Sequence, residues 1–164
     1  KKRDVAPLVV DRPEADYLAA LDPTQSRRAV VTTSRGSFTI ELLWEDAPLT
    51  CLNFVTLIQR GFYDGLAYHR IVPGFVVQDG CPRGDGSGGP GFQIRCEINT
   101  VRYAKGMVGM ALSGKDTGGS QYFVTLAPTP HLDGGYTIFG RVAEGMDVVE
   151  ELVQGDRTLS IVLR

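Results

Sequence analysis

The sequence lacks the features that mark membrane proteins and most nucleic-acid-binding proteins. No apolar run approaches the ~20 residues of a membrane-spanning helix, so no membrane span is expected. The 17 basic and 19 acidic residues give a net charge of −2 without a basic stripe, which argues against nucleic acid as a partner. A chain of 164 residues with this composition fits one soluble globular domain.

Histidine and cysteine are also scarce. The two histidines, His69 and His131, have no carboxylate or cysteine at a metal-ligand spacing, so we predict neither a metal site nor a cofactor. The three cysteines, Cys51, Cys81 and Cys96, form no C-x-x-C pair. A disulfide between Cys81 and Cys96 is one possibility, and three free thiols are the favoured one.

The common motifs of hydrolases and nucleotide-binding proteins are absent. There is no G-x-S-x-G motif, and Ser120 has no base nearby in the sequence. Residues 84–91 are glycine-rich but lack the lysine of a phosphate-binding loop, and we interpret them as a surface loop whose glycines adopt positive φ. A histidine–cysteine or histidine–serine pair assembled only by the fold stays open as a less favoured alternative.

Glycine, in contrast, is abundant: 20 of 164 residues is about 12%, against a usual ~7%. Together with nine prolines, this predicts many tight turns between short strands. Helices are predicted from Asp46 to Gly61 and over residues 145–153. Strands are predicted at residues 29–33, 37–43, 67–71, 75–80, 92–95, 107–111, 121–125, 137–142 and 158–163. A mainly β, antiparallel barrel with two helices follows.

Residues 1–28 differ from the remainder, with mixed charges and a possible short helix over residues 11–21. We interpret them as an N-terminal arm or linker before a domain of residues 29–164, and a partner-binding helix is the less favoured alternative. Because the chain begins at Lys1 and its N-terminus has no signal-peptide core, we expect a domain cut from a longer chain or a processed product. The compartment stays open, and the cytoplasm is slightly preferred to export.

Three segments carry most of the functional information. Residues 68–80 read Tyr-His-Arg-Ile-Val-Pro-Gly-Phe-Val-Val-Gln-Asp-Gly, residues 119–123 read Gly-Ser-Gln-Tyr-Phe, and residues 131–134 read His-Leu-Asp-Gly. Their order and spacing resemble the cyclophilin family of peptidyl-prolyl cis–trans isomerases along nearly all of residues 29–163. The resemblance implies a closed eight-stranded antiparallel β-barrel capped by two α-helices. It also implies isomerisation of Xaa–Pro peptide bonds, which assists protein folding.

The resemblance also assigns roles to particular positions. Arg70 matches the family's catalytic arginine, and Phe75 and Gln78 match the phenylalanine and glutamine of the same signature. Positions that line the family's substrate groove are matched by Val76, Ala111, Gln121, Phe123, His131, Leu132 and Tyr136. Proline-containing polypeptides are therefore the expected partners of a monomeric domain.

Three of these positions depart from the family's usual residues. Val76 replaces a methionine, His131 stands where tryptophan is common, and Tyr136 stands where histidine is frequent. In members that bind cyclosporin tightly, that tryptophan donates its indole N–H to the drug. We therefore expect cyclosporin to bind with reduced affinity, while isomerase activity is retained.

The chemistry of the reaction agrees with the absence of acid–base motifs. Rotation about an Xaa–Pro bond breaks no covalent bond, so it needs no nucleophile, base or metal. An apolar pocket for the proline ring and a cationic hydrogen-bond donor for the twisting amide suffice. The alternative is a cyclophilin-like module of a larger protein that binds proline-containing peptides with little catalysis.

Overall fold

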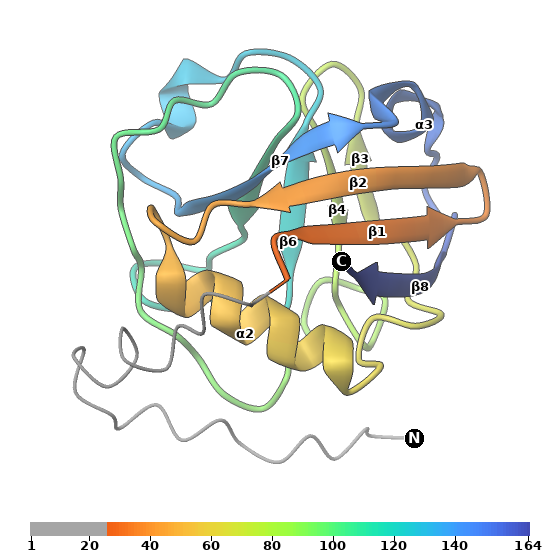
Figure 1. Ribbon diagram of the computed structural model, residues 1–164, viewed down its shortest axis with the longest axis horizontal. Coiled ribbons are helices and arrows are strands. Elements are labelled where there is room, and N and C mark those ends of the chain that lie inside the picture. Colours follow the sequence, from red (N-terminus) through yellow and green to blue (C-terminus); the bar gives the residue numbers. More distant parts are fainter. Residues whose placement is uncertain (1–25) are drawn as a thin grey trace.

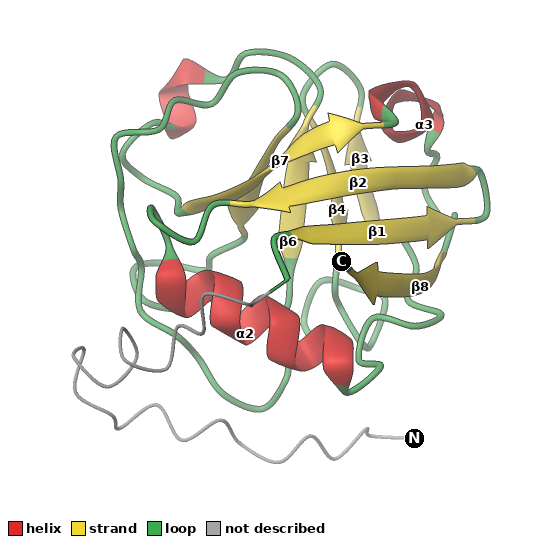
Figure 2. Cartoon of the chain, in the orientation of Figure 1, coloured by secondary structure: helices red, strands yellow, loops and turns green. Residues whose placement is uncertain are grey.

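A computed structural model describes residues 26–164, so the arm at residues 1–25 and its predicted helix at 11–21 lie outside the described part (Figure 1). Within residues 26–164, two α-helices, α2 (Pro48–Gln59) and α3 (Met146–Glu151), and one 3₁₀ helix, η1 (Pro130–Leu132), accompany the strands (Figure 2). The strands are β1 (Arg28–Thr33), β2 (Gly36–Leu42), β3 (Arg70–Val72), β4 (Val76–Asp79), β5 (Met107–Met110), β6 (Tyr122–Thr125), β7 (Ile138–Glu144) and β8 (Thr158–Leu163).

The eight strands form one antiparallel sheet in the order β3-β4-β6-β5-β7-β2-β1-β8. The sheet curls, and the segment that precedes β3 approaches the start of β8. There the Tyr68 N–H donates to Asp156 O at 2.8 Å and the Thr158 N–H donates to Leu66 O at 2.9 Å. The predicted eight-stranded antiparallel architecture is confirmed, whereas continuous strand pairing around a closed barrel stays a prediction.

Helix α2, for which the sequence predicts an apolar face, packs against β7 and β8. Pro48 occupies the first turn, where its missing N–H has no intrahelical partner to lose. The free N–H groups of Leu49 and Thr50 donate to the carboxylate of Glu97, from a distant loop, at 3.1 and 2.6 Å. Gly61, with φ of 66°, follows the end of the helix.

The prediction of a strand at residues 92–95 is wrong. Only Ile94 forms an isolated bridge, with Gly118. Just after residue 95, two backbone N–H groups donate to side chains and not to a neighbouring strand: Cys96 N to Asp116 Oδ1 at 2.9 Å and Glu97 N to Thr137 Oγ1 at 2.8 Å. This loop carries Glu97 to the N-terminus of α2, and a straight strand would not take it there. The strand predicted at 67–71 is also shorter, since β3 begins at Arg70.

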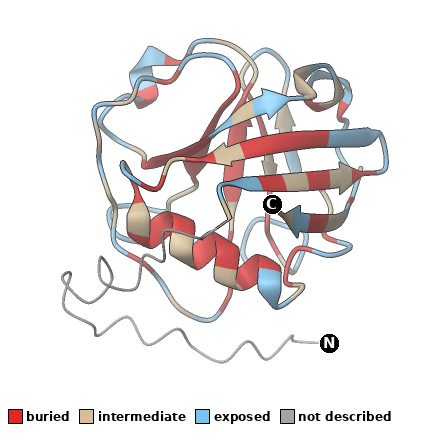
Figure 3. Cartoon of the chain, in the orientation of Figure 1, coloured by how far each residue is buried: buried red, intermediate tan, exposed pale blue. Residues whose placement is uncertain are grey.

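Two apolar clusters lie on opposite faces of the central strands, because successive side chains of a strand point to opposite faces. The larger cluster joins the sheet to α2 and includes Val77, Val108, Tyr122 and Val124 together with Phe54 of α2. Figure 3 shows buried positions both along the strands and along α2. The smaller cluster, which we call the outer cluster, consists of buried Val76, Tyr103, Met107, Phe123, Leu132 and Ile138. Adjacent residues of β4, β5 and β6 thus belong to different clusters.

Two further sequence predictions, on the cysteines and on the glycine-rich loop, are confirmed. All three cysteines are free thiols. Several glycines of the 84–91 loop adopt positive φ, among them Gly84 at 73° and Gly86 at 87°. Within residues 26–164, no helix is both long and apolar enough to cross a membrane.

Candidate active site

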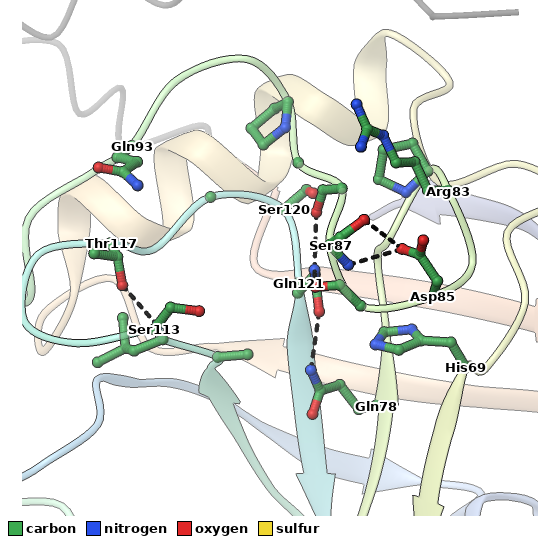
Figure 4. Close-up of a pocket in the computed structure, with 18 of the residues that line it drawn as sticks. His69, Gln78, Arg83, Asp85, Ser87, Gln93, Ser113, Thr117, Ser120 and Gln121 are labelled. Atoms are coloured by element: carbon green, nitrogen blue, oxygen red, sulfur yellow. Dashed lines mark hydrogen bonds between the residues drawn. The ribbon is translucent and has the colours of Figure 1, made fainter.

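Strand pairing places the predicted polar residues of the site on one face of the sheet. Arg70 lies directly opposite Gln78, and Gln78 lies opposite Phe123. The Arg70 Nη1–H donates to Gln78 Oε1 at 3.3 Å. The Gln78 Nε2–H donates to Gln121 Oε1 at 3.0 Å (Figure 4). These contacts form a continuous row from a guanidinium through two side-chain amides.

The outer cluster provides the apolar part of the same face. Val76, Phe123 and Leu132 are buried in it, and Phe75, Ala111 and Tyr136 pack against it with partial exposure. An apolar surface of this kind, beside a cation and two amides, can hold an apolar ring and bind the polar chain attached to it.

Two residues that were not predicted from the sequence as site residues support Phe123. They belong to the part of the apolar surface beneath this ring, which we call the floor. The Tyr103 ring stacks on Phe123 with centroids 5.7 Å apart, and Gly109 lies opposite Phe123 in β5. A Cβ on Gly109 would clash with the Tyr103 hydroxyl and lie 2.5 Å from Phe123 Cζ. Glycine at this position therefore lets the two rings stack over the strand.

The rim of the apolar surface is formed by His131 and Tyr136. His131 is exposed at the short helix η1, and its ring centroid lies 5.4 Å from that of Phe75. Tyr136 meets Phe123 edge-on at 6.0 Å. Two of the three departures from the family's usual residues, His131 and Tyr136, therefore lie at the edge of the apolar surface.

A more polar cavity adjoins this surface and shares Arg70, Gln78, Ala111 and Gln121 with it (Figure 4). Its lining also includes His69, residues of the glycine-rich loop, Ser113 and Thr117. The Gln121 Nε2–H₂ group donates to Gly86 O and Gly88 O, each at 2.8 Å. The glycine-rich loop is thus a wall of the cavity and supports a site residue.

The electrostatics of the site are simple. Arg70 is exposed, and within residues 26–164 no carboxylate forms an ion pair with it, so its charge is available to a ligand. Burial lowers the pKa of His69 and so favours its neutral form. In the described part of the chain, no group of three or more histidine, cysteine or acidic side chains is placed to hold a metal ion.

The fold brings all ten predicted site residues to this one face. The sequence reading missed Tyr103, Met107 and Ile138 of the floor and the contact of the glycine-rich loop with Gln121. His69 was missed as well, although the sequence signal for it was the strongest, since it directly precedes Arg70 in the motif. The floor residues lie in segments with no local pattern that points to a site.

Comparison with known proteins agrees with the motifs. The family described as cyclophilin-type peptidyl-prolyl cis-trans isomerase matches residues 28–161. The chain belongs to the cyclophilin family. This cyclophilin is 47% identical over 138 residues to a peptidyl-prolyl cis-trans isomerase of Helicobacter pylori, covering 82% of this chain and 85% of that one. It is 48% identical over 136 residues to one of Synechococcus elongatus, covering 82% and 94%.

Solved structures show the same fold. A cyclophilin-type isomerase of Cryptosporidium parvum superimposes on this cyclophilin with a TM-score of 0.79 at 29% identity, over 85% of this chain and 98% of that one. A second structure, of the Cryptosporidium protein in the presence of the dipeptide Ala-Pro, gives a TM-score of 0.78. Family membership and fold together identify this cyclophilin as a peptidyl-prolyl cis-trans isomerase.

Proposed function

We propose that this cyclophilin isomerises Xaa–Pro bonds of polypeptides on the face formed by Arg70 and the outer cluster. The unaided reaction takes tens to hundreds of seconds because amide resonance sets a barrier of ~18–20 kcal/mol. A rate gain of about 10⁵ requires about 7 kcal/mol of stabilisation that is specific to the twisted transition state. Among the ten site residues, Arg70 is the one with a permanent charge.

The observation that carries this proposal is the position of the Arg70 guanidinium beside the apolar surface. As the C–N bond twists, conjugation is lost and electron density localises on the prolyl nitrogen. A cationic N–H donor there stabilises the twisted form more than the planar one. Gln78 accepts one N–H of Arg70 at 3.3 Å and so holds the guanidinium at this place. Arg70, Phe75 and Gln78 accordingly form the proposed catalytic group.

The remaining residues are proposed to bind the substrate. Val76, Phe123 and Leu132 accept the proline ring, with Phe75 at its edge, and burial of that ring excludes water from the reacting amide. Gln121 and the backbone near Ala111 bind the flanking chain. The Ala111 N–H itself already donates to Gln121 O at 3.0 Å, so a bound peptide uses other groups at this edge. His131 and Tyr136 contact residues beyond the proline.

Isomerisation of a Xaa-Pro tetrapeptide, measured in a protease-coupled assay, tests the function. We expect catalysis of cis-to-trans conversion that is proportional to enzyme concentration and is abolished by heat denaturation. Titration of the same peptide by NMR provides the second readout. Saturable binding without acceleration would reject the enzyme and support the alternative of a proline-peptide binding module.

A further inference from the structure

The glycine-rich loop that follows β4 folds around a buried sulfur atom. Cys81 is 1% exposed, and its Sγ accepts the backbone N–H groups of Gly86 and Gly88, each at 3.2 Å. Its own S–H points toward Asp85 Oδ1 at 3.8 Å. Glycine-rich backbone has many accessible conformations, so two bonds to one atom restrict this loop strongly.

The same two glycines hold a residue of the active site. While their N–H groups face the sulfur, their carbonyl oxygens both accept from Gln121 Nε2 at 2.8 Å. An amide side chain has a donor end and an acceptor end of nearly the same shape, so its partners decide which end points where. Two carbonyls side by side can pair only with the NH₂ end of Gln121.

The orientation of the Gln121 amide determines which groups donate and which accept along the row from Gln121 through Gln78 to Arg70. With its NH₂ group bound to the loop, Gln121 presents Oε1 to Gln78 and accepts from Gln78 Nε2 at 3.0 Å. Gln78 is then left with Oε1 facing Arg70, where an acceptor is required because a guanidinium only donates. If Gln121 were reversed, two donors would meet at Gln78, and Gln78 would have to turn its own NH₂ group toward Arg70.

The beginning of the loop is fixed as well, so the sulfur has a defined place. Ser120 Oγ donates to Gly80 O at 2.7 Å, and Gly80 adopts φ of 94°. A Cβ at Gly80 would lie 2.9 Å from Gln121 Cα, so the chain just before Cys81 packs directly on the chain before β6. Farther along, the Asp85 carboxylate accepts the N–H and the hydroxyl of Ser87, at 2.8 and 2.6 Å.

We propose that Cys81 is a positioning residue of the isomerase: its sulfur shapes the loop whose carbonyls orient Gln121, and through Gln78 this orients Arg70. The inference rests on the proposed role of Arg70. It differs from a role in packing because it requires a hydrogen-bond acceptor at position 81, and a small apolar group of similar volume does not supply one.

The test compares Cys81→Ala, which removes the acceptor, with Cys81→Ser, which keeps one. Steady-state kinetics on a Xaa-Pro tetrapeptide should show kcat of C81A lowered about 10-fold with KM within about 2-fold, because Arg70 acts in the transition state. C81S should recover to within about 3-fold of the unmodified protein. Cys51→Ala is the matched control: Cys51 is a buried thiol in the larger cluster, and its loss should leave kcat unchanged.

A measurement on the unmodified protein covers the case in which C81A does not fold. Amide hydrogen exchange of Gly86 and Gly88 should be slowed at least about 10-fold relative to Gly89 of the same loop, since their N–H groups are bound to sulfur. Exchange as fast as that of Gly89 would overturn the proposal.

The kinetic outcomes also separate this inference from the proposed site. If Arg70→Ala loses activity while C81A keeps the kcat of the unmodified protein, Cys81 has no positioning role and the site stands. If C81S is as slow as C81A, the size of the sulfur matters and its acceptor function does not, which also overturns the inference. If Arg70→Ala itself retains full activity, the proposed site is wrong and this inference is wrong with it.

Discussion

Strands β4, β5 and β6 have an inner face toward the larger cluster and an outer face toward the outer cluster, and adjacent residues build the two. The faces differ in the burial of their rings and in charge. On the inner face Phe54, Tyr63 and Tyr122 are fully buried and contact one another edge-on or tilted at 5.3–5.6 Å. On the outer face the rings of Phe75 and Tyr136 stay partly exposed, and a charged side chain lies at the edge. The comparison indicates that the inner face contributes most to stability, and that the outer face leaves rings partly exposed where we propose that substrate binds.

Phe54→Ala should give the largest change in stability. This ring is fully buried and contacts three other rings, so its loss should lower the free energy of unfolding by about 3–5 kcal/mol. At a temperature where the variant is still folded, kcat/KM should stay within about 2-fold. Urea unfolding measures the first effect and the peptide assay the second. A large loss of kcat/KM in the folded variant would contradict the assignment of stability to the inner face and of activity to the outer face.

The inner face also carries a buried acid whose effect depends on pH. Asp79 accepts the Thr158 hydroxyl at 2.6 Å and the Tyr122 hydroxyl at 3.3 Å, and its other carboxylate oxygen has no partner. Burial raises its pKa to about 7. Since the unfolded pKa is ~3.9, folding favours the protonated acid, and stability should fall by up to about 4 kcal/mol as pH rises from 4 to 7.

Asp79→Asn should remove this loss of stability with rising pH. The free energies of unfolding of the two proteins are compared at pH 4, 5.5, 7 and 8. The difference isolates Asp79 from His69, whose lowered pKa gives a slope of opposite sign below its ordinary value. Parallel curves across this range would show that Asp79 is already ionised in the folded protein.

Phe123→Ala is the matched change on the outer face. Phe123 is 5% exposed and stacks on Tyr103, so we expect a loss of about 3 kcal/mol in stability, at the lower end of the range for buried rings. Unlike Phe54→Ala, it should also raise KM for the peptide, because the ring forms part of the proposed proline pocket. An unchanged KM in the folded variant would remove Phe123 from the substrate surface.

The strands of this fold could be predicted from the sequence more reliably than the residues and contacts that hold the site residues in place. Short apolar segments between glycine-rich turns located β4, β5 and β6, and the resemblance to the family identified Arg70, Gln78 and Gln121. The prediction of a strand at Phe92–Arg95 was wrong, and the N–H groups that follow this segment donate to side chains distant in sequence. The contact of Gln121 with Gly86 spans 35 residues, and Tyr103 lies outside every predicted element. Such long-range contacts leave no local periodicity.

The smallest expected effect concerns the rim. His131 is exposed beside Phe75, and an imidazole offers less apolar area than an indole and a different donor position. His131→Trp should strengthen inhibition by cyclosporin roughly 5- to 150-fold, equivalent to about 1–3 kcal/mol, and leave peptide turnover within a few-fold. Inhibition constants of the two proteins measure this, and equal constants would show that position 131 does not contact the drug.

The central claim is that Arg70 acts in catalysis and contributes little to the fold, and one variant tests it most directly. Arg70→Ala, assayed for kcat/KM on a Xaa-Pro tetrapeptide and for urea unfolding, should lose at least about 100-fold in kcat/KM, or about 2.7 kcal/mol. Its free energy of unfolding should change by less than about 0.5 kcal/mol, as expected for an exposed side chain. Arg102→Ala, at an exposed arginine outside the site, should change neither quantity. An Arg70→Ala protein that folds and turns over peptide like the unmodified protein would contradict the account.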